Sequence, residues 1–135
     1  MLRRMDTKRI GDVSQLMVEA ALLVKGYSVL VPIGDNDRYD FVIEKDGDFK
    51  KVQCKTGRIK SGAVRFRTCN YNRKGERNSY AGEVDYFGVY CPDNGMCYLV
   101  PSNEVGVAGC NLRVVPPRSN QRHTFPIRWA DGYEL

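Results

Sequence analysis

The sequence has 135 residues, of which 42% are hydrophobic and 27% are charged. This length fits a single domain over residues 1–135, large enough to bury a core without disulfides or a structural metal. No apolar run is long enough to span a bilayer, and the basic, polar segment from Met1 to Ile10 does not resemble a signal peptide. We therefore expect a cytoplasmic protein that has no membrane partner.

The charge balance and the cysteines narrow the class of protein further. The formal net charge is +5, which favours a polyanionic partner such as nucleic acid but also fits many ordinary basic proteins. An odd number of cysteines without a CxxC pair argues against a disulfide framework and against a zinc knuckle. We expect reduced, mostly buried thiols. The cysteines are Cys54, Cys69, Cys91, Cys97 and Cys110.

The N-terminal part of the sequence predicts a helix followed by a strand. From Ile10 to Val24 apolar residues recur at helical spacing, and Lys25-Gly26 provides a basic last turn and a glycine stop. The next segment, Tyr27–Pro32, is rich in β-forming residues and ends in proline. It predicts a strand that leads into a polar loop at residues 34–38.

A β-hairpin is the next predicted element. Two β-rich runs, Tyr39–Lys45 and Asp48–Thr56, are separated by Asp46-Gly47. This dipeptide readily adopts positive φ and favours a two-residue hairpin turn. We therefore expect an antiparallel pair in which Lys45 lies opposite Asp48.

This register sorts the hairpin side chains into two faces. Counting outward from the turn brings Asp40 opposite Gln53, and Lys55 lies two residues along on the same face. One face of the hairpin is then a polar cluster and the other belongs to the core. The polar face also carries Glu44 and Lys51, and the core face carries Phe41, Ile43, Val52 and Cys54.

The segments after the hairpin alternate between loop and strand patterns. Residues 57–62 form a basic stretch bounded by glycines, which we interpret as a loop. Val64–Arg67 alternates apolar and basic residues, as expected of a half-buried strand whose arginines face solvent or a ligand. Residues 70–82 contain few apolar residues and predict an exposed, mobile loop.

The C-terminal part predicts a second hairpin and a short strand. Tyr86–Cys91 and Met96–Val100 flank a Pro-Asp-Asn-Gly turn, and Leu112–Val115 has strand character. The single histidine, His123, lies in a polar, arginine-rich tail. The sequence therefore argues against a His-centred nuclease and against a serine-type triad, and we expect the His123 side chain to be solvated.

The polar face of the first hairpin suggests a magnesium site. Magnesium prefers hard oxygen ligands. Asp40 offers an anionic oxygen, Gln53 an amide oxygen, and Cys54 its backbone carbonyl. Lys55 could then orient a metal-activated water or balance charge in the transition state of phosphodiester cleavage. An ordinary solvated surface is the alternative interpretation of the same side chains.

A family resemblance supports the first interpretation. Asp40, followed by Gln53-Cys54-Lys55 on the next strand and preceded by a helix that bears Gly11, resembles the motif of the PD-(D/E)XK nuclease superfamily. More closely, Arg38-Tyr39-Asp40 and Val52–Gly57 resemble the subgroup of intron-associated homing endonucleases, which is related to archaeal Holliday junction resolvases. The likeness continues through Gly26-Tyr27, Gly82–Asp85, Val89–Pro92 and Tyr98–Pro101.

The resemblance implies a fold, an activity and an assembly. The implied fold is an α/β, restriction-endonuclease-like domain with a central mixed β-sheet flanked by helices. The implied activity is DNA hydrolysis that depends on Mg²⁺, with Mn²⁺ as the expected substitute. The implied assembly is a homodimer or a homotetramer.

The sequence departs from the family pattern at the acidic positions. Gln53 stands where the motif has Asp or Glu, a replacement that the homing-endonuclease branch tolerates, and metal affinity should be weaker for it. Related nucleases often place an acid four residues after the helix glycine, where this sequence has Gln15. Glu19, one helical turn later on the same face, could reach the site instead.

A basic series follows Lys55 and predicts a DNA-contact surface. Such side chains near a cutting site would bind phosphates, and an asparagine on the loop could read base edges. A solvated basic face is the alternative. The predicted DNA-contact residues are Arg58, Lys60, Arg65, Arg67, Asn72, Arg73, Lys74 and Arg77.

Aromatic and acidic residues near this series have two interpretations each. Phe66, Tyr71 and Tyr80 could stack on the bases of a single strand, but packing within the protein is the commoner role. Glu83 and Asp85 could add negative charge near a metal, whereas capping or pairing with neighbouring arginines is the simpler expectation.

These observations favour a magnesium-dependent DNA endonuclease similar to homing endonucleases. A junction resolvase, which would bind branched DNA by its shape, is the alternative within the same class. A catalytically inactive DNA-binding module of the same fold is the alternative outside it, because Gln53 and Gln15 remove negative charge from the predicted site.

Overall fold

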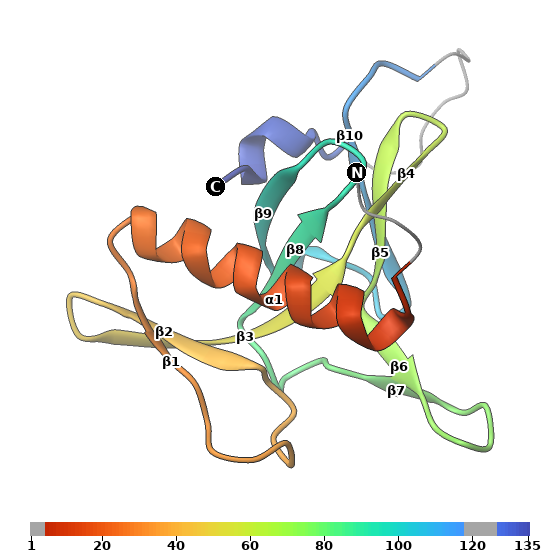
Figure 1. The fold of residues 1–135 in the computed structure, drawn as a ribbon. Coiled ribbons are helices and arrows are strands. Elements are labelled where there is room, and N and C mark those ends of the chain that lie inside the picture. The colour runs from red at the N-terminus through yellow and green to blue at the C-terminus, as the bar shows by residue number, and fades with distance from the viewer. Residues whose placement is uncertain (1–4, 118–126) are drawn as a thin grey trace.

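The computed structural model describes residues 5–117 and 127–135 (Figure 1), so His123 lies outside the described residues. A five-stranded mixed sheet forms the centre, in the order β1-β2-β3-β8-β9. Only β3 and β8 run parallel, and the other neighbours are antiparallel. The strands are β1 (Ser28–Leu30), β2 (Phe41–Lys45), β3 (Asp48–Thr56), β8 (Tyr86–Cys91) and β9 (Met96–Pro101).

Two smaller sheets complete the strand content of the described chain. A three-stranded sheet has the order β10-β5-β4, and β6 pairs with β7 in a separate hairpin. Two short 3-10 helices, η1 (Ser102–Glu104) and η2 (Ala130–Tyr133), lie near the C-terminus. The remaining strands are β4 (Arg58–Lys60), β5 (Ala63–Arg67), β6 (Cys69–Tyr71), β7 (Arg77–Ser79) and β10 (Gly109–Arg113).

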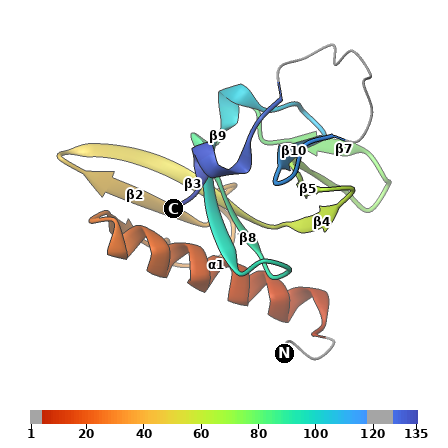
Figure 2. The ribbon, with the colours of Figure 1, turned by 90° about the horizontal axis from the view of Figure 1, so that it is seen from above.

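A single α-helix, α1 (Thr7–Val24), covers one face of the central sheet (Figure 2). It begins one turn before the predicted start because Asp6 caps it, accepting a hydrogen bond from the Arg9 backbone N–H at 2.8 Å. It ends before Gly26, whose φ of 92° suits only glycine. The predicted mixed sheet is confirmed, but the described residues contain one flanking α-helix instead of several. The three-stranded sheet lies beyond the end of β3 that leads into β4.

Close contact between α1 and the sheet depends on Gly88 in β8. A Cβ atom at Gly88 would lie 2.6 Å from Cγ1 of Val18 and 3.2 Å from Cγ1 of Val52. Both of these valines are fully buried. The absence of a side chain at Gly88 is what lets the helix approach the strand.

We therefore expect Gly88→Ala to destabilise the fold by about 1–3 kcal/mol, the usual cost of overpacking a core. Gly11→Ala is the matched control, since Gly11 lies in α1 and an added Cβ there meets no heavy atom within 4 Å. The control should instead stabilise the helix by up to about 1 kcal/mol. Urea unfolding monitored by circular dichroism measures both effects, and equal stabilities would contradict the packing argument.

Two segments predicted to be loops are β-hairpin strands. Residues 58–60 form β4, which pairs with β5 through a turn at Ser61 (φ 50°) and Gly62 (φ 75°). Residues 69–71 and 77–79 form β6 and β7. The predicted strand at 112–115 begins earlier, at Gly109, because its partner is β5. The first two elements are local hairpins that the sequence pattern did not signal, whereas β10 pairs with a strand more than 40 residues away.

Other predictions about the core are confirmed. All five cysteines are free, and four of them are buried while Cys54 is half-buried. The exposed arginines Arg65 and Arg67 point out of β5, and β8 and β9 form the predicted hairpin.

No helix within residues 5–117 and 127–135 is both long and apolar enough to cross a membrane.

Candidate active site

The β2–β3 hairpin has the predicted register from Lys45↔Asp48 to Phe41↔Val52. The ladder ends there, so Asp40 does not form the expected regular pair with Gln53. Instead the Asp40 backbone N–H donates to the carbonyl of Val52 at 2.9 Å, and its Oδ2 accepts from the backbone N–H of Cys54 at 2.7 Å. A carboxylate that bonds a nearby backbone N–H competes with strand pairing, and it holds the Asp40 side chain against β3.

The backbone carbonyl of Cys54 lies on the side of β3 that faces Asp40 and has no partner strand there. The N–H and C=O groups of one strand residue point toward the same neighbouring strand, so the Cys54 carbonyl also points to the side of β2. Because β2 begins only at Phe41, this carbonyl faces Asp40 instead of a partner strand. Among the described residues Asp40 Oδ1 makes no hydrogen bond. The Cys54 carbonyl oxygen and Asp40 Oδ1 are thus both available as ligands near the end of the hairpin.

The charges of Asp40 and Lys55 influence each other. Burial raises the pKa of Asp40 above its usual value, while the Cys54 N–H bond and the charge of Lys55 act in the opposite direction. Burial lowers the pKa of Lys55, the charge of Asp40 raises it, and the cations Arg38 and Arg67 lower it. The structure therefore places a half-buried carboxylate and a half-buried amine near enough for their charges to interact.

These groups offer hard oxygen ligands but little charge. No cluster of three His, Cys, Asp or Glu side chains able to hold a metal occurs in the part of the chain that the structure describes. Gln53 is half-buried on β3, and its side chain forms no hydrogen bond with the described residues. A carboxylate, an amide oxygen and a backbone carbonyl suit a Mg²⁺ ion that keeps several waters.

Helix α1 contributes to the site from the other side of β3. The Ser14 hydroxyl is hydrogen-bonded to that of Thr56 at 2.6 Å, which fixes the helix against β3. Burial, then the charges of Asp40 and Glu19, raise the pKa of the Cys54 thiol. The Glu19 carboxylate is thus near enough for its charge to act on the Cys54 thiol. Gln15 is half-buried, and its side chain forms no hydrogen bond within the described residues.

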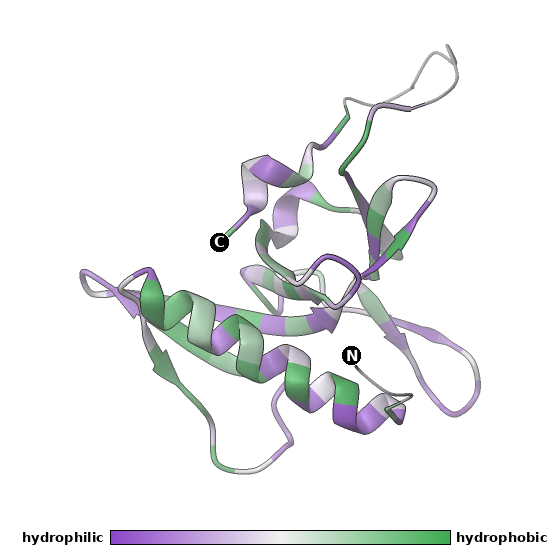
Figure 3. Ribbon diagram, turned by 45° about the horizontal axis from the view of Figure 1, so that its top comes forward, coloured by the Kyte–Doolittle hydropathy of each residue, from purple (hydrophilic) through white to green (hydrophobic). Residues whose placement is uncertain are grey.

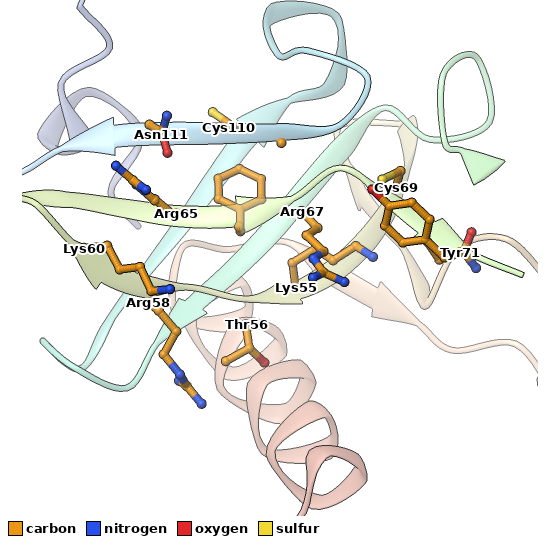
Figure 4. Close-up of a pocket in the computed structure, with 13 residues that line it drawn as sticks. Lys55, Thr56, Arg58, Lys60, Arg65, Arg67, Cys69, Tyr71, Cys110 and Asn111 are labelled. Carbon is orange, nitrogen blue, oxygen red and sulfur yellow. The ribbon is translucent and has the colours of Figure 1, made fainter. Parts of the chain in front are cut away.

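A basic hollow of about 920 Å³ opens beside Lys55 (Figure 4). It lies over the exposed face of β4 and β5 and extends to Cys69 and Tyr71 of β6. Lys55 and Arg67 lie next to each other in it. The predicted DNA-contact residues that line it are Arg58, Lys60, Arg65 and Arg67.

The remaining predicted DNA-contact residues lie on the β6–β7 hairpin, which is mostly hydrophilic toward its tip (Figure 3). Arg73, Lys74 and Arg77 are exposed there. The side chain of Asn72 forms its hydrogen bonds within the turn. Its Oδ1 accepts from the backbone N–H groups of Lys74 and Glu76, both at 2.9 Å. Its amide donates to the Glu76 carboxylate at 2.7 Å. Asn72 would have to give up these bonds to read a base.

Arg38 is a site residue that the sequence did not single out. Its guanidinium forms a salt bridge with Glu83, donates to the Ser79 carbonyl at 3.0 Å, and lies 4.0 Å from the centroid of the Tyr80 ring. The expected pairing of Glu83 with an arginine is thus confirmed. Asp85 instead accepts from the backbone N–H of Lys51 at 2.8 Å. No local sequence pattern signals these contacts, because they join segments about 40 residues apart.

Comparisons with known proteins agree with this geometry. The sequence profile of the PD-(D/E)XK endonuclease family matches residues 5–135. Among solved structures, the bacterial homing endonuclease I-Ssp6803I is similar, with a TM-score of 0.72 and 27% sequence identity. The match covers 96% of this chain and 89% of that one. A search of curated proteins finds no match.

Proposed function

The chain belongs to the PD-(D/E)XK endonuclease family, and from this premise we propose that it is a magnesium-dependent DNA endonuclease of the homing type. The observation that carries the proposal is the meeting of Asp40 and Lys55 at the end of the β2–β3 hairpin. A carboxylate and an amine beside a cation-lined hollow are suited to a phosphodiester.

Each residue of the proposed site has a distinct chemical role. Asp40, Gln53 and the Cys54 carbonyl would hold the divalent cation, and Glu19 would add negative charge from α1. When bound, the cation supplies Lewis-acid polarisation of the phosphate and acidifies a coordinated water. Lys55 directs its ammonium toward the scissile phosphate and offsets the negative charge that develops there.

The basic hollow provides the DNA-contact surface in this proposal. The side chains of Arg58, Lys60, Arg65 and Arg67 would neutralise backbone phosphates and fix the position of the strand relative to Lys55. The cations of the β6–β7 hairpin would extend this contact along the duplex.

Cutting both strands of a duplex calls for two active sites, and a homodimer or homotetramer supplies them. Exposed apolar side chains on α1 and around β1 support such an assembly, since large exposed apolar surface marks interaction sites. These side chains are Leu23, Val24, Leu30, Val31 and Ile33.

An inactive DNA-binding module is the second candidate. It is favoured by the limited negative charge of the site, where Gln53 and Gln15 replace acids and the described residues hold no cluster of three metal-binding side chains. The basic hollow would then serve binding alone.

Cleavage assays distinguish these functions. We expect the purified protein to cut duplex plasmid with Mg²⁺ or Mn²⁺ and to leave it intact in EDTA. Linear product that appears without a nicked intermediate would indicate an oligomer that cuts both strands in one encounter. Cutting restricted to a four-way junction would indicate a resolvase. Salt-dependent binding without cutting of plasmid, junction or single strands, with either metal, would establish the inactive module.

A further inference from the structure

The ring of Tyr80 contacts two cations at the candidate site. The Lys55 Nζ atom lies 4.5 Å from the ring centroid, and the Arg38 Cζ atom lies 4.0 Å from it. Only 5% of Tyr80 is exposed. A cation over a desolvated aromatic face is attracted by the negative potential of that face.

The ring itself has little freedom to move. It packs against the Phe87 ring in an edge-to-face arrangement, with centroids 6.0 Å apart and an interplanar angle of 83°. Arg38 fixes the chain on both sides of Tyr80 by donating to the Ser79 carbonyl and forming a salt bridge with Glu83. The aromatic face is therefore a rigid contact surface.

Lys55, in contrast, has few other means of being held. Within residues 5–117 and 127–135 no carboxylate forms an ion pair with its ammonium, and the amine makes no hydrogen bond. A lysine amine stands on a flexible stem of four carbons. Without a fixed contact it would sample many positions, and the exposed neighbour Arg67 would push it away from the hollow.

We propose that Tyr80 is a positioning residue for Lys55, whose ammonium the ring holds beside Asp40, where it can offset the negative charge that develops on a DNA phosphate. This inference rests on the proposed function of Lys55. Because Tyr80 directly follows β7, the same ring connects the basic β6–β7 hairpin to the Lys55 ammonium. The phenol hydroxyl has no part in this role, which belongs to the aromatic face alone.

Two substitutions at Tyr80 distinguish the role of the aromatic ring from that of its hydroxyl. Tyr80→Phe retains the aromatic face and should cut DNA like the natural protein. Tyr80→Leu removes it and should lower kcat by about 100-fold, the effect of a displacement near 1 Å at a reacting group. Its Kd for DNA in EDTA should stay within about twofold, because Tyr80 is too buried to contact phosphates.

A spectroscopic measurement reports on the amine without catalysis. Reductive ¹³C-methylation labels the lysines, and comparison with Lys55→Arg assigns the Lys55 signal. We expect this signal to be shifted upfield by the ring current in the natural protein and in Tyr80→Phe, and to move to the position of exposed lysines in Tyr80→Leu. Tyr80→Met, whose unbranched side chain refills the space, replaces the leucine variant if thermal melting shows that leucine prevents folding.

The outcomes separate this inference from the proposed function. Natural protein that fails to cut any DNA would count against the proposed function, while the Lys55 signal would still decide whether the ring holds the amine. Natural protein that cuts, together with a ringless variant of unchanged kcat, would overturn the positioning role. An unshifted Lys55 signal in the natural protein would overturn it as well.

Discussion

Replacing Lys55 by alanine is expected to lower the rate of DNA cleavage by about 100- to 1,000-fold, the loss seen when one preorganised electrostatic group is removed from a transition state. Lys55 combines partial burial with a charge interaction with Asp40 and a position at the edge of the basic hollow. Single-turnover cleavage of a plasmid in Mg²⁺ measures the effect.

Lys51→Ala is the matched control for this prediction. Lys51 lies on the same strand but is exposed, and its ammonium is 5.7 Å from the centroid of the Tyr39 ring. The control should cut at nearly the natural rate. Both variants should still fold, since neither side chain belongs to the core. Equal cleavage by Lys55→Ala and the natural protein would show that the reactive centre lies elsewhere.

The features that the sequence predicted well are set by local chemistry. Asp46-Gly47 fixed the register of the β2–β3 hairpin, because Asp46 (φ 53°) and Gly47 (φ 80°) both adopt left-handed conformations. That register brought Asp40 and Lys55 to one end of one hairpin. The turn therefore accounts for why both residues lie at the same end of the hairpin, and the hydrogen bond from the Cys54 N–H then fixes the Asp40 side chain.

Most features that the sequence did not predict depend on contacts between segments distant in sequence. Arg58–Lys60 is an exception: its basic composition suggested a loop, but it pairs with the adjacent strand β5 in a tight hairpin. The side chain of Asp40 likewise bonds the Cys54 N–H in place of a regular strand pair. The contacts of the Tyr80 ring with two cations could not be predicted either, since Arg38 and Lys55 are distant from Tyr80 in sequence.

The helix shows an intermediate case. Its apolar periodicity correctly predicted a helix, but the stripe on which that prediction rested, Ile10, Val13, Met17, Ala20 and Val24, is not the buried face. Val18 and Leu22 are buried instead, while Met17 and Val24 are exposed. Which polar residue faces the hairpin depends on how the helix is rotated on the sheet. The hydrogen bond between Ser14 and Thr56 fixes this rotation, and the Glu19 charge then acts on the Cys54 thiol. This charge effect is what supports Glu19 as the second acid in the proposed metal centre.

Replacing Asp40 by asparagine is expected to reduce cleavage by about 100- to 1,000-fold through loss of charge with little change in shape. Asparagine keeps a side-chain oxygen that can accept the hydrogen bond from the Cys54 N–H, which is 2.7 Å long in the natural protein. Folding should therefore be preserved. The loss arises because Asp40 is the only carboxylate in the proposed ligand set contributed by the hairpin, and an amide binds a divalent cation with less charge.

Metal titration separates this effect from a general weakening of the protein. Isothermal calorimetry with Mn²⁺ should give heat of binding for the natural protein and for Asp48→Asn, a control on the same hairpin whose exposed carboxylate forms an ion pair with Lys50. Asp40→Asn should give none at the same concentrations. Removing the Asp40 charge also removes an interaction that raises the pKa of Lys55, so the amine holds its proton less firmly in this variant. Undiminished Mn²⁺ binding by Asp40→Asn would mean that the metal is held by other groups, and the role assigned to the hairpin end would be lost.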